Sequence, residues 1–234
     1  MNLGNQMMNS GYLYVCYSED GRKNRFFRNQ FLVSYESLKR VVPNSNVTLY
    51  TNINFENDLG INNVIYDKNI EKSHIAKAVG LLKSPYDKTI FLDTDTVVHR
   101  PVIDTIFEVL DEFDFTCCHA SQHYVRTIYP DLNTGLLGVK KNDFTDMQIA
   151  NWSHEFQTLF QTEGIRSDQY SFRNIFMKYK KHFYILPPWF QFRPCNYSRY
   201  IERAVITHDK SMCRKTSTQA VIKYLETPKS PSGE

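Results

Sequence analysis

One stretch decides the fold, Thr89-Ile90-Phe91-Leu92-Asp93-Thr94-Asp95, in which a continuous apolar run meets a pair of carboxylates. A run that is apolar throughout is typical of a central parallel strand, because such a strand is covered on both faces. At positions i and i+2 of extended backbone, the side chains of Asp93 and Asp95 project to the same side. Two buried carboxylates repel each other and lose hydration, so the pattern indicates a site for a divalent cation.

Alternating strands and helices precede this stretch. Strands are expected over residues 12–17, 47–50 and 64–66. Apolar residues recur at helical spacing in two places between them, first at Phe27, Phe31, Tyr35 and Leu38 and then at Ile75, Val79 and Leu82. This alternation favours an α/β sandwich with a largely parallel sheet. Ligands of such sheets bind outside the carboxyl ends of the strands, which is where the acidic pair is expected.

The chain continues in the same manner after the acidic pair. Further helices are expected around residues 103–113, over 143–160 and over 168–179, and strands over 115–119, 136–139, 184–186 and 204–207. No internal repeat or linker divides the chain. We therefore expect a flexible N-terminus over residues 1–11, a single domain over residues 12–226 and a disordered tail over residues 227–234.

Composition excludes several classes of protein. With 234 residues, 41% apolar and 23% charged, the chain is typical of a globular domain. A net charge of +3 without a basic stripe argues against nucleic-acid binding. No run approaches the roughly 18 apolar residues of a membrane helix. The five cysteines form no CxxC pair, which predicts free thiols, a reducing cytoplasmic location and no structural zinc.

An acidic pair after an apolar strand also occurs in other proteins. An EF-hand loop would need glycine where this chain has Val98. A phosphatase of the haloacid dehalogenase type would use Asp93 as nucleophile and Asp95 as general acid and base. It would also need a downstream acidic pair, which the sequence lacks. A sugar nucleotidyltransferase would need a glycine-rich loop after the first strand, where only Gly21 occurs. The phosphatase remains an alternative.

At this point the chain resembles the GT-A glycosyltransferases, and most nearly glycosyltransferase family 8 with its bacterial galactosyltransferases and glycogenins. Residues 84–98 are similar to the family's strand and DxD signature, and Leu132-Asn133-Thr134-Gly135-Leu136-Leu137 to its Phe-Asn-Ser/Ala-Gly-Val-Leu segment. Asp168-Gln169 is similar to the pair that contacts the donor sugar, and His208 to a late metal-binding histidine. The resemblance implies a Rossmann-like α/β/α sandwich with a mixed, mostly parallel sheet.

The resemblance also implies a set of site residues. Asp93, Asp95 and His208 would bind a metal, for which a histidine nitrogen with carboxylates favours Mn²⁺ over Mg²⁺. Asp168 and Gln169 would act at the reacting carbon. The sugar and acceptor pocket would also contain Asn133, Thr134 and Gly135. The nucleotide and its diphosphate would contact the acidic motif, Asp93-Thr94-Asp95. Outside the motif, they would contact Tyr17, Ser18, Lys77, Lys210 and Arg214.

One segment departs from the family pattern. The family ends in a motif similar to His-x-x-Gly-x-x-Lys-Pro-Trp, whereas His208 is followed by Ser211 at the glycine position and Arg214 at the lysine position, with no Pro-Trp. Arg214 could still neutralise a leaving diphosphate in a bidentate manner. Lys210 or Lys215 could also take that role.

The function implied is transfer of a sugar from a nucleotide-diphosphate donor, a UDP-sugar being favoured, to an acceptor hydroxyl with retention of stereochemistry. The acceptor is a glycan, a protein or a lipid-linked molecule, and we expect residues 124–133 and 187–200 to contact it. An inverting enzyme would instead need a carboxylate base, for which Asp168 is a candidate. A non-catalytic nucleotide-sugar binding module is a further alternative.

Overall fold

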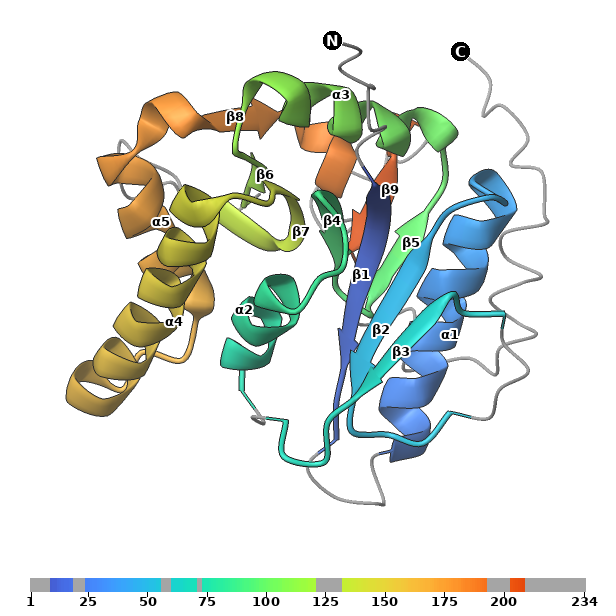
Figure 1. Ribbon diagram of the computed structural model, residues 1–234, viewed down its shortest axis with the longest axis horizontal. Helices are drawn as coiled ribbons and strands as arrows, with labels where there is room; N and C mark the ends of the chain where they lie inside the picture. The colour runs from blue at the N-terminus through green and yellow to red at the C-terminus, as the bar shows by residue number, and fades with distance from the viewer. Residues whose placement is uncertain are drawn as a thin grey trace, which may run out of the picture.

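A seven-stranded sheet forms the centre of the protein, in a computed structural model that describes residues 9–18, 24–55, 60–70, 73–120, 132–192 and 203–208 (Figure 1). The strand order is β3-β2-β1-β4-β7-β6-β8. These strands are β1 (Ser10–Cys16), β2 (Val47–Thr51), β3 (Asn63–Tyr66), β4 (Lys88–Leu92), β6 (Phe115–His119), β7 (Leu132–Lys140) and β8 (Phe183–Leu186).

The sheet is mixed and mostly parallel, which confirms the expected fold class. β7 runs antiparallel to both of its neighbours, and the other pairings in the sheet are parallel. The strand order reverses at β1, with β2 on one side of it and β4 on the other. The crevice at the carboxyl ends beside such a reversal is the usual ligand site of an open α/β sheet. Asp93 leaves the sheet at this crevice, directly after β4.

Helices cover both faces of the sheet. The alternation of side chains along β1 forms the two cores, because Tyr12 and Tyr14 belong to one apolar cluster and Leu13 and Val15 to the other. α1 (Asn24–Val41) and α3 (Thr105–Glu112) pack in the first cluster. α2 (Ile75–Leu82), α4 (Asp143–Glu163) and α5 (Asp168–Lys178) pack in the second. Short 3-10 turns are η2 (Pro101–Asp104), η3 (Lys180–His182) and η4 (Pro188–Gln191).

The inner face of α2 differs from the expected one. Leu82, expected to be buried, is 36% exposed. The buried residues are mostly small: Ile75, Ala76, Ala78, Gly80 and Leu81. A Cβ atom on Gly80 would lie 2.6 Å from Val15 Cγ2, so this glycine lets the helix approach the sheet closely. The apolar periodicity predicted burial of Leu82 because such a pattern gives small residues such as alanine and glycine little weight.

Two short strands form a second sheet that determines the geometry of the site. β5 (Thr96–Val98) pairs antiparallel with β9 (Ile206–His208), and Thr96 lies opposite His208. β5 was not expected from the sequence, and β9 begins and ends slightly later than the strand expected over residues 204–207. The pairing brings residues from distant parts of the sequence to the carboxyl end of β4 (Figure 1).

The described cysteines are free, as expected. Cys16, Cys117 and Cys118 are buried, and burial raises the pKa of the Cys16 thiol to about 12. Cys195 and Cys213 lie outside the described residues. None of the helices in the described ranges has the length and apolar character needed to cross a membrane.

Candidate metal and donor site

The acidic pair lies in a turn between β4 and β5. The backbone N–H of Asp93 donates to the carbonyl of Gly135 at 2.9 Å, and Thr96 Oγ1 donates to the carbonyl of Asp93 at 2.7 Å. The carboxylates therefore converge through this turn, and not through the extended backbone that we expected. The side chains of Asp93 and Asp95 are 20% and 11% exposed, so both are largely removed from water.

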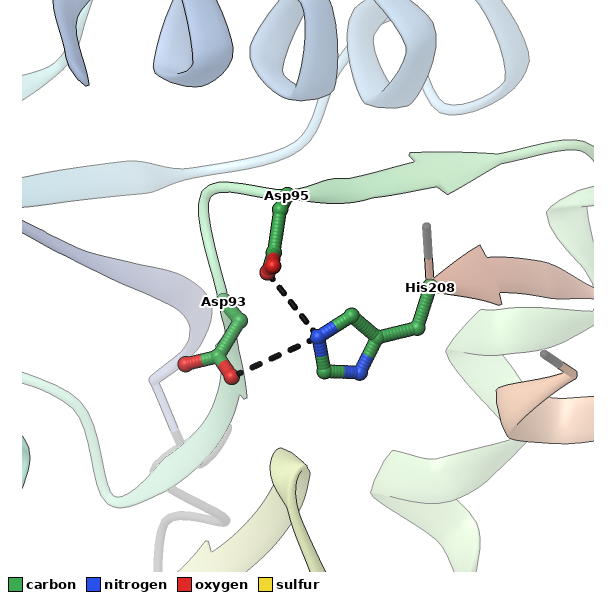
Figure 2. Close-up of side chains that lie close together, drawn as sticks. All are labelled: Asp93, Asp95 and His208. Atoms are coloured by element: carbon green, nitrogen blue, oxygen red, sulfur yellow. Dashed lines mark ion pairs between the residues drawn. The ribbon is translucent and has the colours of Figure 1, made fainter. Parts of the chain in front are cut away.

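His208 completes a cluster with the two carboxylates (Figure 2). Its Nε2 lies 2.9 Å from Asp95 Oδ1 and 3.8 Å from Asp93 Oδ2. One ligand atom from each residue lies within 4.8 Å of the others, and the histidine side chain is only 5% exposed. Two carboxylate oxygens and one imidazole nitrogen are suitable ligands for Mn²⁺. The residues present therefore fit a divalent cation.

Lys77 on α2 joins the acidic pair to a third carboxylate. Its Nζ lies 3.1 Å from Asp93 Oδ1 and 3.6 Å from Asp168 Oδ2, and its side chain is 12% exposed. Burial alone lowers the pKa of Lys77, but the carboxylates of Asp168 and Asp93 raise it by more, and the net shift is upward. Lys77 therefore keeps its positive charge within the site.

Asp168 begins α5 and is buried beside this lysine. Its Oδ2 accepts a hydrogen bond from Thr134 Oγ1 at 2.9 Å, and its backbone carbonyl accepts one from Trp152 Nε1 at 3.1 Å. His74 Nδ1 lies 3.7 Å from Asp168 Oδ1. These contacts fix the carboxylate in one orientation. Gln169 is the next residue of α5 and is half-buried.

β7 forms the wall of the site between the acidic pair and Asp168. Asn133 is 1% exposed; its Oδ1 accepts from the Gly135 N–H at 3.0 Å, and its Nδ2 is buried without a hydrogen-bond partner among the described residues. Thr134 Oγ1 lies 3.4 Å from Lys77 Nζ. A Cβ on Gly135 would lie 2.6 Å from His208 Cε1 and 2.8 Å from Asp93 Oδ2, so this position has no space for a side chain.

The loop after β1 reaches the same edge of the sheet. Ser18 is buried, and its N–H donates to Asn52 Oδ1 at 3.0 Å while Asn52 Nδ2 donates to the Ser18 carbonyl at 3.1 Å. This amide continues the pairing of β1 with β2 beyond their last strand residues. Tyr17 is partly buried against the second apolar cluster. Stacking of Tyr17 on a base stays a prediction.

The structure brings together most of the residues that the sequence suggested and adds one that it did not. Gln191 on η4 is 2% exposed, and its Nε2 lies 3.1 Å from His208 Nδ1. No motif contains this glutamine, which lies within the aromatic segment 187–200 that was expected to contact the acceptor. Lys210, Ser211, Arg214 and Lys215 lie outside the described residues, as do residues 124–131 and 193–200 of the expected acceptor segments.

Replacing Lys77 with methionine is expected to lower the free energy of unfolding by about 3 kcal/mol, because removal of one partner leaves buried carboxylates without compensation. Urea unfolding in EDTA measures this loss. Lys83→Met is the control, because the Lys83 side chain pairs with Asp67 at 2.8 Å but is 43% exposed. Its replacement should therefore lower the free energy of unfolding only slightly. Equal losses in the two variants would contradict the role assigned to burial.

Comparison with known proteins shows similarity in structure but not in sequence. No protein-family model matches the chain, and no curated protein matches it. The galactosyltransferase LgtC, solved with donor and acceptor sugar analogues, is 14% identical with a TM-score of 0.61, over 92% of this chain and 95% of LgtC. The glycosyltransferase GlyE of Streptococcus pneumoniae TIGR4 is 14% identical with a TM-score of 0.60, over 93% of this chain and 62% of GlyE. Mouse xyloside xylosyltransferase 1 is 14% identical with a TM-score of 0.56, over 87% of this chain and 98% of that protein.

Such low identities establish the architecture alone. The alignments cover nearly all of the chain, and the sheet with its helical layers agrees with the expected architecture. The chain therefore has the GT-A fold, which these glycosyltransferases share.

Proposed function

We propose that the chain is a metal-dependent glycosyltransferase that moves a sugar from a nucleotide-diphosphate donor, with a UDP-sugar favoured, to an acceptor hydroxyl. The observation that carries the proposal is the convergence of Asp93, Asp95 and His208 at the carboxyl end of β4. This end of the sheet, at the reversal of strand order, is where open α/β sheets bind their ligands. Membership of family 8 is a finer part of the same proposal.

The charges of the described site favour a divalent cation. Asp93, Asp95 and Asp168 supply three carboxylates, and Lys77 supplies one ammonium group. The excess of two negative charges would repel a diphosphate unless a divalent cation balanced it. Asp93, Asp95 and His208 would hold that cation, with Mn²⁺ preferred and Mg²⁺ as the second choice. When bound, it supplies Lewis-acid stabilisation of the negative charge that develops on the leaving diphosphate.

The other described residues position the donor. Thr134 and Lys77 both engage Asp168 Oδ2, which leaves Oδ1 toward His74. A carboxylate that is already held by a hydroxyl and an ammonium group has a fixed orientation, which suits it to accept hydrogen bonds from sugar hydroxyls. This favours a positioning role for Asp168, with Gln169. The proposal includes retention of stereochemistry, which rests on the resemblance to family 8. Asn133 Nδ2, which is buried and has no hydrogen-bond partner among the described residues, is a further donor suited to a sugar oxygen.

The proposal also includes contacts of Lys210 and Arg214 with the diphosphate. Tyr17 and Ser18 would contact the nucleoside. Asn52 accepts from the N–H of Ser18 and donates to its carbonyl, and these two hydrogen bonds hold the loop after β1 in place. The phosphatase alternative is less favoured, because the fold is shared with glycosyltransferases and Asp93 follows the fourth strand of the chain. A glycan, a protein and a lipid-linked molecule remain the candidate acceptors.

The decisive experiment measures donor hydrolysis by the purified chain. A panel of nucleotide-diphosphate sugars is incubated with Mn²⁺ or with EDTA, and the released nucleoside diphosphate is quantified by chromatography. Release that depends on Mn²⁺ and on one donor supports the proposal. A thermal shift with UDP and Mn²⁺ but no release from any donor would indicate a binding module. Hydrolysis of p-nitrophenyl phosphate, with no release from any donor, would indicate the phosphatase.

A further inference from the structure

Gln191 is a buried glutamine behind the candidate metal ligand His208. Its side chain is 2% exposed, and its Nε2 lies 3.1 Å from His208 Nδ1. The other end of the amide, Oε1, is buried and has no hydrogen-bond partner among the described residues. Because this end of the amide makes no hydrogen bond with the described residues, no second bond holds the nitrogen rather than the oxygen toward Nδ1.

The two nitrogens of His208 have different surroundings. Nε2 faces Asp95 Oδ1 at 2.9 Å and Asp93 Oδ2 at 3.8 Å, whereas Nδ1 faces Gln191. A neutral imidazole has one N–H donor and one lone-pair acceptor. A nitrogen that binds a metal must offer its lone pair, so the other nitrogen carries the hydrogen and needs an acceptor.

We propose that Gln191 is a positioning residue for the metal site, whose amide oxygen accepts the Nδ1–H of His208 when Nε2 binds a divalent cation. Without a bound cation, His208 Nε2–H would donate to Asp95 Oδ1 and the Gln191 amide nitrogen, 3.1 Å from Nδ1, would donate to Nδ1. A half turn of the amide exchanges its nitrogen and oxygen, so the same side chain serves both tautomers. This inference rests on the proposed function, because it needs a divalent cation at the site.

The backbone keeps the amide and the ring together. The His208 N–H donates to the Phe192 carbonyl at 2.9 Å, and the Phe192 N–H donates to the Ile206 carbonyl at 2.8 Å, so η4 is attached to β9 on both sides of the contact. A Cβ on Gly135 would lie 2.6 Å from both Gln191 Nε2 and His208 Cε1. The amide and the ring therefore pack over the same glycine, and Gln191 stays beside Nδ1 in either tautomer.

Two substitutions separate hydrogen bonding from packing. Gln191→Met keeps a similar volume without a donor or acceptor, and Gln191→Glu keeps an acceptor but no donor. Binding of Mn²⁺ alone, measured by electron paramagnetic resonance of the free ion, is expected to be at least about tenfold weaker in Gln191→Met. Gln191→Glu should bind at least as tightly as the wild type, because it supplies a permanent acceptor. Gln148→Met is the control, because Gln148 is a buried glutamine of α4 that accepts from Asn151 in its own helix.

A spectroscopic measurement on the wild type tests the tautomer directly. In protein labelled with ¹⁵N-histidine, addition of Mg²⁺ should move the hydrogen of one imidazole from Nε2 to Nδ1, and this change should disappear in His208→Ala. If no histidine changes tautomer while Mg²⁺ binds, the inference is overturned, and this result does not depend on whether Gln191→Met folds. Equal Mn²⁺ affinity in wild type and Gln191→Met would also overturn it and would leave the proposed function intact. Absence of Mn²⁺ binding by the wild type would overturn the proposed metal dependence itself.

Discussion

Replacing Asp95 with asparagine is expected to lower Mn²⁺-dependent release of nucleoside diphosphate from the donor by about a thousandfold. The amide oxygen of asparagine can still accept from His208 Nε2, which Asp95 Oδ1 meets at 2.9 Å, so the fold should persist. The variant loses one of the two negative charges that would hold the cation. Metal stabilisation of a transition state amounts to several kcal/mol, and each 1.36 kcal/mol is a factor of ten in rate.

The measurement is donor hydrolysis across a range of Mn²⁺ concentrations, and the matched control is Asp114→Asn. Asp114 also pairs with a histidine, with its Oδ2 2.6 Å from His182 Nδ1, but it precedes β6 at the amino end of that strand. Its loss should leave the Mn²⁺ dependence unchanged. Undiminished, metal-independent turnover by Asp95→Asn would refute the assigned role of the acidic pair, whatever the control does.

The sequence predicted those parts of the site that are local in the chain. The acidic pair follows a run of apolar residues, and β4 is buried at all five positions, so its place in the centre of the sheet could be inferred from composition alone. The alternation of strands and helices predicted the parallel sheet, and the parallel sheet predicted which edge binds ligands. Lys77 and Asp168 could be suggested only through a resemblance, because neither lies in a motif with a mechanism of its own.

Tertiary pairing determines the parts that could not be predicted. A strand was expected over residues 204–207, near β9, but the three-residue β5 is too short for a periodic signal. The pairing of β5 with β9, which places His208 beside the acidic pair, could not be predicted. Gln191 meets His208 because η4 is hydrogen-bonded to β9. Asn52 meets Ser18 because β1 and β2 are neighbours in the sheet. Each contact joins residues that are distant in sequence or that follow different strands. Residue spacing within the sequence therefore does not predict these contacts.

Replacing Gly135 with alanine is expected to abolish detectable Mn²⁺ binding and donor hydrolysis together. The new Cβ would lie 2.6 Å from His208 Cε1, 2.6 Å from Gln191 Nε2 and 2.8 Å from Asp93 Oδ2, all closer than real Cβ contacts allow. The backbone cannot retreat easily, because the Gly135 carbonyl accepts from the Asp93 N–H at 2.9 Å. The methyl group therefore separates Asp93 from His208, and the three ligand atoms no longer converge.

Gly138→Ala in the same strand distinguishes loss of the site from loss of the fold. Its Cβ would lie 2.3 Å from Thr116 Cγ2 and 2.9 Å from Ile106 Cγ2, which are core atoms. Overpacking of this kind costs about 1–3 kcal/mol of stability but should leave the Mn²⁺ affinity of the folded protein unchanged. Urea unfolding and Mn²⁺ titration of both variants give the comparison. If Gly135→Ala bound Mn²⁺ as tightly as Gly138→Ala, the cation would have to bind elsewhere than between Asp93 and His208, because an intact pair cannot share that space with a methyl group.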